Sequence, residues 1–493
     1  MIDLPTALYD AAGARALDDR AIRIHGIDGY ELMSRAGAAA WDTARRLWPG
    51  ARRIVVVCGK GNNGGDGYVV AALAARDGLS VEMAALGEPR SDESARARRF
   101  AAEQGVDAVP IDDVDFGAAD LVVDGVLGTG LAQAPADAAA VAIGKINACA
   151  SPVLALDIPS GLDSDTGCAP GVAVKARATC TFIGLKLGLV TGVGPELAGE
   201  VVHDGLGVPA AVFDEVPCAA RRIDRTLVES WLPRRSRCAH KGEQGHVMLV
   251  GGNEGMTGAL RIAAEAAARS GAGLVTAATR SRHAMFINIA QPEIMVSGVD
   301  DGDALTRMGE GRQAIGIGPG LGLDEWAASL LDRALAAGVP MVADADALNL
   351  LAAGRTPPPG TVLTPHPGEA ARLLGVGTRE ISRDRPGSAR DIARRYRCVC
   401  VLKGCGTVVT DGDVLYVCDR GNPGMATGGM GDCLTGIITA LLGRGLAPLR
   451  AAVCGTRLHA AAADLEAAAH GMAGMLATDL LPHLRTLLEP HDD

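Results

Sequence analysis

Aromatic side chains are scarce in this sequence of 493 residues, which has five Phe, five Tyr and four Trp. Concentrated positive charge is also missing, since the net charge is −11 and the arginine clusters are short. A nucleic-acid-binding protein needs a basic face, so we expect no nucleic-acid partner. No uninterrupted apolar run reaches the roughly 20 residues that a membrane-spanning helix requires, so we expect no membrane partner.

The twelve cysteines are scattered, and no two of them form a Cys-x-x-Cys pair. This spacing argues against a zinc site and against a disulfide framework, and it favours a reducing compartment. The first residues also lack the basic-then-apolar pattern of a secretory signal. We therefore expect a cytoplasmic protein.

Glycine and aliphatic residues are abundant, with 65 Gly and a hydrophobic fraction of 48%. Short apolar runs alternate with helical patterns, which is typical of α/β folds whose parallel sheet is covered on both faces. The length exceeds one ordinary core, and the periodicity breaks between residues 211 and 242, so we predict domains at 1–217 and 218–493. The expected strands are 54–58, 80–86, 121–124, 153–157 and 178–182, then 246–250, 274–278, 314–317, 341–344, 361–363, 398–402, 408–410 and 414–418.

A glycine-rich segment near the C-terminus is the most informative part of the chain. Residues 421–431 contain five glycines, and apolar residues then recur at helical spacing from Leu434. This pattern predicts a bare-backbone loop that enters a helix N-terminus, where free N–H groups favour an anion. Asp432 stands at the junction, where it could accept a proton from a hydroxyl that attacks a phosphate. The alternative is that Asp432 only caps the helix.

Oxygen-bearing side chains recur at the expected strand ends of the first domain. The strand at 54–58 leads into a glycine-rich loop over 59–67, and two further strands end in Asp124 and Asp157. Ligands of open α/β sheets bind at the carboxyl ends of strands, and hard oxygen donors suit a hard cation or a polar ligand. We therefore expect one crevice that collects Asn63, Asp124, Asp157 and Ser160, although a single strand-end Asp can also be a turn residue.

Four motifs, at 61–67, 123–131, 156–161 and 186–188, resemble the NAD(P)H-hydrate epimerase domain over roughly residues 10–210. The resemblance implies a Rossmann-like fold that interconverts the two C6 epimers of hydrated NADH or NADPH. The implied substrate contacts are Asn62, Asn63, Gly64, Gly65, Asp66, Gly128, Thr129, Gly130, Leu131, Ala132, Gln133, Ala134 and Asp157. The implied ligands of a potassium ion are Asn63, Asp124 and Ser160. Our hypothesis is that Asp157 handles the proton when the hydroxyl leaves or returns.

Charged residues also follow expected strands of the second domain. Asp344 and Asp346 open a helix and serve either the site or the helix cap, an alternative that the sequence leaves open. His366 and Glu369 precede another helix, and Lys403 begins a glycine-containing loop after a strand. Together with the Asp432 helix, these residues have the content of a phosphoryl-transfer site.

Residues 225–490 resemble the ribokinase-like superfamily and, within it, the ADP-dependent NAD(P)H-hydrate dehydratase. The matching motifs are at 240–242, 251–252, 258–259, 318–322, 364–369, 403–407 and 422–432. The implied contacts with the hydrated nicotinamide are Ala259, Gly320, His366 and Asp432. The implied contacts with the adenine nucleotide are Lys403, Gly404, Cys405, Gly406, Thr407 and Gly431. Cys405 and Cys433 depart from the family pattern, in which we expect residues like Ala and Val.

The resemblance implies a bifunctional enzyme made of two three-layer α/β/α domains. Asp432 would accept the proton of the C6 hydroxyl as that hydroxyl attacks the terminal phosphate of ADP, with magnesium as the expected companion ion. The expected partners are hydrated NADH or NADPH, ADP and further copies of the chain in a homo-oligomer. The alternative is a ribokinase-like vitamin kinase fused to a non-catalytic nucleotide-binding module, which a product assay would distinguish.

Overall fold

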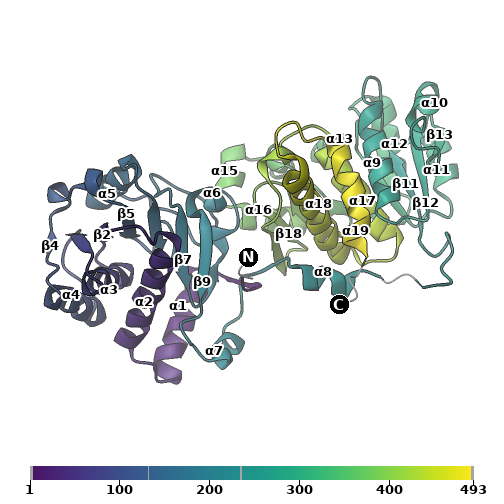
Figure 1. Ribbon diagram of the computed structural model, residues 1–493. Coiled ribbons are helices and arrows are strands. Elements are labelled where there is room, and N and C mark those ends of the chain that lie inside the picture. Colours follow the sequence, from purple (N-terminus) through teal and green to yellow (C-terminus); the bar gives the residue numbers. More distant parts are fainter. Residues whose placement is uncertain (1–3, 132, 234–235, 490–493) are drawn as a thin grey trace. The chain divides into compact units, whose positions relative to one another are not determined.

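The computed structural model describes residues 4–131, 133–233 and 236–489 (Figure 1). Contacts within the chain divide it into two compact units, of which the first ends at Arg222 and the second begins at Ile223. Each unit has its own sheet and its own helices. Within the described part of the chain, no helix has the length and hydrophobicity needed to cross a bilayer.

The first unit contains a parallel sheet with the strand order β4-β3-β2-β5-β6-β7-β9. Its strands are β2 (Arg53–Cys58), β3 (Ser80–Ala85), β4 (Ala108–Val109), β5 (Leu121–Gly125), β6 (Val153–Leu156), β7 (Ala178–Phe182) and β9 (Glu200–Asp204). In addition, β1 (Ala7–Tyr9) pairs with β8 (Leu185–Lys186) and with β10 (Ala220–Arg222). The strands predicted for this domain are confirmed close to their expected bounds.

Helices cover both faces of this sheet. Ile54 and Val56 of β2 belong to a core shared with α2 and α3, whereas Val55 and Val57 point to the other face and pack in a core with α5. This alternation is what a strand buried on both faces requires. The helices are α1 (Ala11–Asp19), α2 (Gly29–Leu47), α3 (Asn62–Arg76), α4 (Asp92–Glu103), α5 (Asp137–Ala148), α6 (Gly194–Ala198) and α7 (Ala210–Glu215).

The expected glycine loop at 59–67 is wrong in its extent, because helix α3 already begins at Asn62. The glycines there allow close packing of the backbone. A Cβ atom on Gly64 would lie 2.0 Å from the carbonyl oxygen of Gly59, and one on Gly65 would lie 2.5 Å from the Met33 side chain. Tertiary packing therefore overrides the low helix propensity of glycine in this first turn.

The second unit contains a sheet with the order β13-β12-β11-β14-β15-β16-β17-β18-β19. Neighbours are parallel as far as β17, and the β17–β18 and β18–β19 pairs are antiparallel, which confirms the predicted hairpin. The strands are β11 (His246–Val250), β12 (Leu274–Thr279), β13 (Met295–Gly298), β14 (Ala314–Ile317), β15 (Met341–Ala343), β16 (Val362–Leu363), β17 (Val399–Leu402), β18 (Thr407–Thr410) and β19 (Leu415–Cys418).

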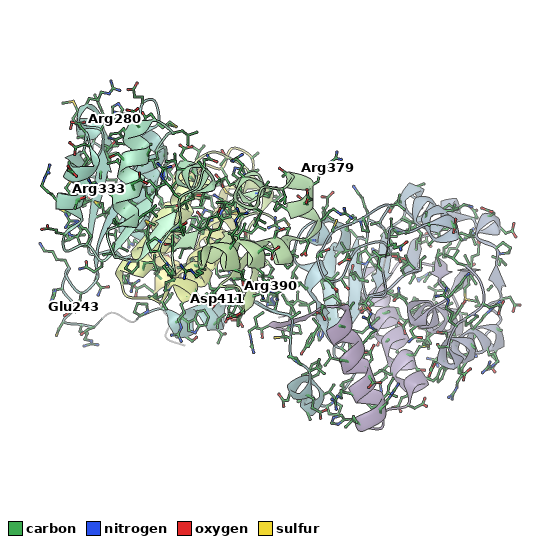
Figure 2. The ribbon with its side chains drawn as sticks, turned by 180° about the vertical axis from the view of Figure 1, so that it is seen from behind. Glu243, Arg280, Arg333, Arg379, Arg390 and Asp411 are labelled. Atoms are coloured by element: carbon green, nitrogen blue, oxygen red, sulfur yellow. The ribbon has the colours of Figure 1, made fainter. Side chains whose placement is uncertain are left out.

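Apolar faces of α9, α17, α18 and α19 form one core with this sheet, which includes Ile437 and Leu441 of α17 and Val247 and Leu249 of β11. Elsewhere α12 contacts β14, and α16 contacts β17 and β18. Charged residues such as Arg333 and Asp411 lie at the surface (Figure 2). The helices are α8 (Arg225–Trp231), α9 (Thr257–Arg269), α10 (Ala284–Ile287), α11 (Gly302–Gly309), α12 (Glu325–Leu335), α13 (Asp346–Ala352), α14 (Pro367–Leu374), α15 (Thr378–Arg383), α16 (Arg385–Tyr396), α17 (Met430–Gly443), α18 (Pro448–His470) and α19 (Leu481–Leu488).

Candidate active sites

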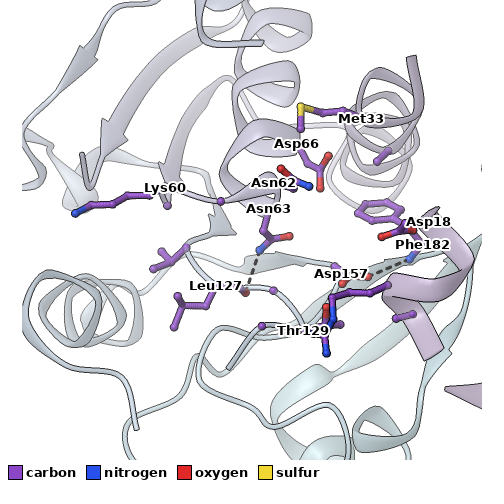
Figure 3. Close-up of a pocket in the computed structure, with 18 of the residues that line it drawn as sticks. Asp18, Met33, Lys60, Asn62, Asn63, Asp66, Leu127, Thr129, Asp157 and Phe182 are labelled. Atoms are coloured by element: carbon purple, nitrogen blue, oxygen red, sulfur yellow. Dashed lines mark hydrogen bonds between the residues drawn. The ribbon is translucent and has the colours of Figure 1, made fainter. Parts of the chain in front are cut away.

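A cavity of about 690 Å³ lies at the carboxyl ends of the central strands of the first unit (Figure 3). Its wall combines the start of α3, the loop after β5, the end of β6 and parts of α1 and α2. The predicted substrate contacts that line it are Asn62, Asn63, Asp66, Gly128, Thr129, Gly130 and Asp157. The predicted contacts that are not part of this lining are Gly64, Gly65, Leu131, Gln133 and Ala134. Ala132 lies outside the described residues.

Asp157 follows β6 in the left-handed backbone region, with a φ of 64°. Its Oδ1 atom forms an ion pair with Nζ of Lys186, and the backbone N–H of Phe182 donates to the same oxygen at 3.4 Å. Lys186 is buried and also donates to the carbonyl oxygen of Phe182 at 2.8 Å. Lys186 therefore fixes the orientation of the Asp157 carboxylate. Sequence reasoning gave Lys186 no role, because only the folded chain shows that it meets Asp157.

Two further carboxyl groups line the same cavity. Burial raises the pKa of Asp66 well above its usual range, and repulsion from Asp157 and Asp18 raises it further. Although Asp18 keeps an exposed surface, desolvation by the surrounding protein raises its pKa, and repulsion from Asp157 adds to this rise. The cavity thus contains two carboxyl groups with a raised pKa, Asp66 and Asp18, and a third, Asp157, that forms an ion pair with Lys186. Asp18 was missed because in the sequence it reads as a solvent-facing acid of a helix.

The three predicted potassium ligands come together beside this cavity. Ser160 donates from Oγ to Asp124 Oδ1 at 2.6 Å and from its backbone N–H to Oδ2 at 2.9 Å. Asn63 donates from Nδ2 to the carbonyl oxygen of Leu127 at 3.0 Å, while its Oδ1 is buried without a hydrogen-bond partner. Burial raises the pKa of the fully buried Asp124 to about 6. Oγ of Ser160 also lies 3.1 Å from the carbonyl oxygen of Leu127, so the same loop connects the three residues. An unpartnered buried amide oxygen together with a buried carboxylate fits a hard cation.

In the second unit, the loops after β14 to β17 bring together residues that lie far apart in the sequence. A Cβ atom on Gly320 would lie 3.2 Å from Cβ of Ala259 and 2.6 Å from the carbonyl oxygen of Met256, so Gly320 and Ala259 are neighbours. His366 is the N-cap of α14, where its Nδ1 accepts from the backbone N–H of Gly368 at 2.9 Å. Its side chain is about half exposed, at 51%.

Lys403 connects three of these loops. Its backbone N–H donates to the carbonyl oxygen of Pro365 at 2.9 Å, and its Nζ lies 2.7 Å from Asp344 Oδ1 and 3.9 Å from Glu369 Oε2. Burial alone would lower the pKa of Lys403, but the negative charges of Asp344 and Glu369 outweigh this effect, so its pKa is raised. A Cβ atom on Gly431 would lie 3.2 Å from both Asp344 Oδ2 and Lys403 Nζ. The loop at 403–407 and the start of α17 therefore meet at this ion pair.

The helix-cap alternative is wrong for Asp344 and Asp346. The N-cap of α13 is Ala345, whose side chain makes no capping bond. The carboxylate of Asp344 binds Lys403 and accepts from Oγ1 of Thr435 at 2.9 Å. Asp346 instead accepts from the backbone N–H of Gly322 at 2.8 Å, which holds the loop after β14.

Asp432 is in the first turn of α17, whose N-cap is Gly429 with a φ of 91° and no side-chain capping bond. Burial raises the pKa of Asp432 to about 7, with added repulsion from Asp344 and partial compensation by Lys403. A carboxyl group with such a pKa, next to the free N–H groups of a helix N-terminus, suits proton transfer near neutral pH. The predicted loop-to-helix transition is confirmed.

This fold and this site define a two-domain α/β enzyme that combines a Rossmann-like unit with a ribokinase-like phosphoryl-transfer unit. Residues 29–188 match the family described as YjeF-related protein N-terminus, and residues 247–485 match the family described as NAD(P)H-hydrate dehydratase. The chain belongs to the bifunctional NAD(P)H-hydrate repair enzymes, which join an epimerase domain to an ADP- or ATP-dependent dehydratase domain.

Curated relatives match over nearly their whole length. A bifunctional NAD(P)H-hydrate repair enzyme of Coxiella burnetii is 45% identical, over 98% of this chain and 100% of the relative. One of Escherichia coli is 43% identical, over 99% of this chain and 95% of the relative. A solved ADP/ATP-dependent NAD(P)H-hydrate dehydratase of Bacillus subtilis, co-crystallised with ATP/Mg²⁺, is 33% identical with a TM-score of 0.50, over 54% of this chain and 96% of that one.

Proposed function

We propose that the first unit interconverts the R and S forms of hydrated NADH and NADPH, and that the second unit dehydrates the S form with ADP as phosphoryl donor. The observation that carries this assignment is the position of Asp432, half-buried in the first turn of α17 and influenced by the Lys403–Asp344 pair. A transferable phosphate would meet helix N–H groups there, and a hydroxyl next to it would meet a carboxylate able to take its proton.

The dehydration follows from this arrangement. Asp432 accepts the proton of the C6 hydroxyl while the oxygen attacks the terminal phosphorus of ADP, and the phosphoanhydride bond breaks to release AMP. The N–H groups at the start of α17 stabilise the charge on the transferred group. The C6–O bond of the phosphate ester then breaks, a proton leaves C5, and the nicotinamide double bond is restored with release of phosphate. Phosphate leaves far more readily than hydroxide.

The remaining residues of this site bind and orient the reactants. Ala259, Gly320 and His366 would face the hydrated nicotinamide, and the loop at 403–407 with Gly431 would hold the nucleotide. No three acidic, histidine or cysteine side chains of the described chain form a metal cage. Magnesium would therefore enter on the phosphates of the nucleotide, where it neutralises part of their charge.

In the first unit, Asp157 would assist the departure of the C6 hydroxyl and its return to the opposite face of the ring. Lys186 keeps the carboxylate of Asp157 aimed at this position. Asn63, Asp124 and Ser160 would hold the potassium ion, which would balance the buried charge of Asp124 and fix the loop after β5. Asn62, Asp66 and residues 128–130 would contact the dinucleotide.

The direct test is the return of reduced-nicotinamide absorbance when the protein acts on hydrated cofactor with ADP or with ATP. We expect AMP and phosphate as products with ADP. Asp432→Asn should lower the dehydration rate by about 10² to 10⁴ and leave epimerisation intact, and Asp157→Asn should do the reverse. A phosphorylated vitamin as product, without recovery of reduced nicotinamide, would support the kinase alternative instead.

A further inference from the structure

Arg385 is a buried cation that the chemistry above does not use. It is the first residue of α16, and only 5% of its surface is exposed. One guanidinium nitrogen, Nη2, donates to the carbonyl oxygens of Leu402 and Lys403, at 3.2 Å and 3.3 Å. Its Nε atom is buried without a hydrogen-bond partner. The side chain therefore lies directly beneath the beginning of the loop at 403–407.

The positive charge of Arg385 lacks an acidic partner in the described part of the chain. Burial lowers its pKa, and the groups that act against this effect are the thiols of Cys405 and Cys400. The preceding residue, Asp384, uses its carboxylate to cap α16, where Oδ1 accepts from the N–H of Gly387 at 2.7 Å. A buried guanidinium is costly unless an anion compensates it, so the charge points to an anionic ligand.

The geometry of the loop connects this charge to the nucleotide. A Cβ atom on Gly404 would lie 2.9 Å from Nη1 and 3.0 Å from Nη2 of Arg385, so the guanidinium packs against the loop backbone. The carbonyl of Lys403 is turned toward Arg385. Because a trans peptide holds its C=O and N–H on opposite sides, the N–H of Gly404 is directed away from Arg385, toward the other side of the loop.

We propose that Arg385 is a positioning residue for the nucleoside diphosphate. It anchors two carbonyls so that a backbone donor of the loop faces the phosphates, and its charge becomes balanced when those phosphates bind. This proposal rests on the assignment of residues 403–407 to nucleotide binding. A hydrogen bond from a backbone N–H to a charged phosphate is stronger than one between neutral groups. The adenosine part of the ligand carries no charge, so Arg385 should matter for binding the phosphates and not for binding adenosine.

The test compares the affinities of adenosine, AMP, ADP and ATP for the full chain and for Arg385→Met, Arg385→Lys and Arg395→Met. Arg395 is the matched control, since it lies on the same helix and donates to the carbonyl oxygen of Leu374 at 3.0 Å, but it is exposed. We expect Arg385→Met to weaken ADP binding by about 10- to 100-fold with little effect on adenosine. Arg385→Lys should recover part of the loss, and Arg395→Met should match wild type.

Steady-state kinetics give a second readout. In Arg385→Met, the KM for ADP should rise while kcat at saturating ADP and the epimerisation rate stay near wild type. An equal loss for adenosine and ADP would assign Arg385 a purely structural role, and unchanged ADP affinity would also overturn the proposal. If Arg385→Met does not fold, the affinities of Arg385→Lys for adenosine and for ADP are compared with those of wild type instead. A loss for ADP alone would support the proposal, and an equal loss for both or no loss would overturn it. Failure of the wild-type chain to dehydrate with ADP would overturn the proposed function itself.

Discussion

Asp432 and Asp124 illustrate how burial sets the protonation of single side chains in the two units. In both cases burial raises the carboxyl pKa, to about 7 for Asp432 and about 6 for Asp124. Their neighbours differ: Lys403 opposes the rise at Asp432, whereas Asp124 has only hydrogen-bond donors from Ser160 and Val126 to lower it. The first environment suits a base that must exchange a proton near neutral pH, and the second suits a carboxylate that holds a cation.

The pH dependence of dehydration should report Asp432. A base must be deprotonated to accept a proton, so kcat/KM should fall as the pH drops through about 7. Because Lys403 lowers the pKa of Asp432, Lys403→Met should move this limb to higher pH, besides weakening nucleotide binding. The pH profile is measured by reduced-nicotinamide absorbance. Asp157→Asn is the control, because its dehydration rate should fall at low pH as in wild type. A wild-type rate that does not change across neutral pH would contradict the base assignment.

The buried Asp124 should make epimerisation depend on potassium. Asp124→Asn keeps the size of the side chain but removes the charge that the ion would balance, so we expect a large loss of rate that added potassium does not restore. The rate of interconversion of the two epimers is measured against potassium concentration, with choline chloride keeping the ionic strength constant. Equal potassium dependence in the variant and in wild type would argue against this ion site.

Helices α3 and α17 both contain glycine in the first turn, but the glycines have different surroundings. Helix α17 starts after Gly429, whose φ of 91° is left-handed, and a Cβ atom on Gly431 in its first turn would lie 3.2 Å from Asp344 Oδ2 and Lys403 Nζ. Helix α3 starts at Asn62 and is packed so closely that Gly64 nearly touches the backbone of Gly59. Glycine therefore leaves room beside charged side chains in α17, where we propose that the phosphate binds, and permits dense packing in α3.

This difference predicts the effect of alanine in α3. The Cβ atom of Gly64→Ala would lie 2.0 Å from the carbonyl oxygen of Gly59, so the backbone must shift, and we expect a loss of about 1–3 kcal/mol or more in the free energy of unfolding. The matched control is Gly61→Ala, because a Cβ atom there meets nothing within 4 Å. Urea unfolding followed by circular dichroism gives the comparison, and equal stability of the two variants would refute the packing argument.

The sequence predicted the buried parallel strands well, because they are continuous apolar runs, as at Ile54 to Cys58. It did not predict β9 and β13, which are only partly buried. It also predicted the start of α17, where glycines and apolar spacing agree. The sequence did not predict that α3 starts at Asn62, because its glycines favour a loop locally. The helix forms there because Gly64 packs closely against the backbone of Gly59, which only the folded chain shows. Lys186 and Arg385 could not be predicted either, since their partners Asp157 and Leu402 are brought to them by the fold.

At the scale of the whole molecule, the chain contains two compact units with separate cores and separate sites. The described residues that line the cavity of the first unit all belong to that unit. The residues assigned to dehydration lie between Ala259 and Asp432, all in the second unit. We therefore expect each reaction to need no catalytic group from the other unit.

This separation predicts complementation between variants. Neither Asp157→Asn nor Asp432→Asn alone should convert the R form of hydrated cofactor to reduced cofactor at an appreciable rate, but their mixture should, because the S form made on one molecule diffuses to another. Recovery of absorbance is measured for each variant and for the mixture, starting from the purified R form. Because the R form also epimerises spontaneously, a no-enzyme sample sets the background. A mixture no faster than the variants alone would mean that the intermediate does not leave the molecule.

The antiparallel pairing of β17 with β18 has a consequence for how this enzyme can change in evolution. Leu402 lies opposite Val408 and Val401 opposite Val409, so the turn between them has a set length. Inserting or deleting one residue there would slip the register and move the buried valines to the wrong face. A change of side chain, such as the exposed Cys405, leaves the register intact. We therefore expect this turn to accept a change of side chain at Cys405 more readily than a change in the number of its residues, as long as Lys403 keeps its ion pair with Asp344.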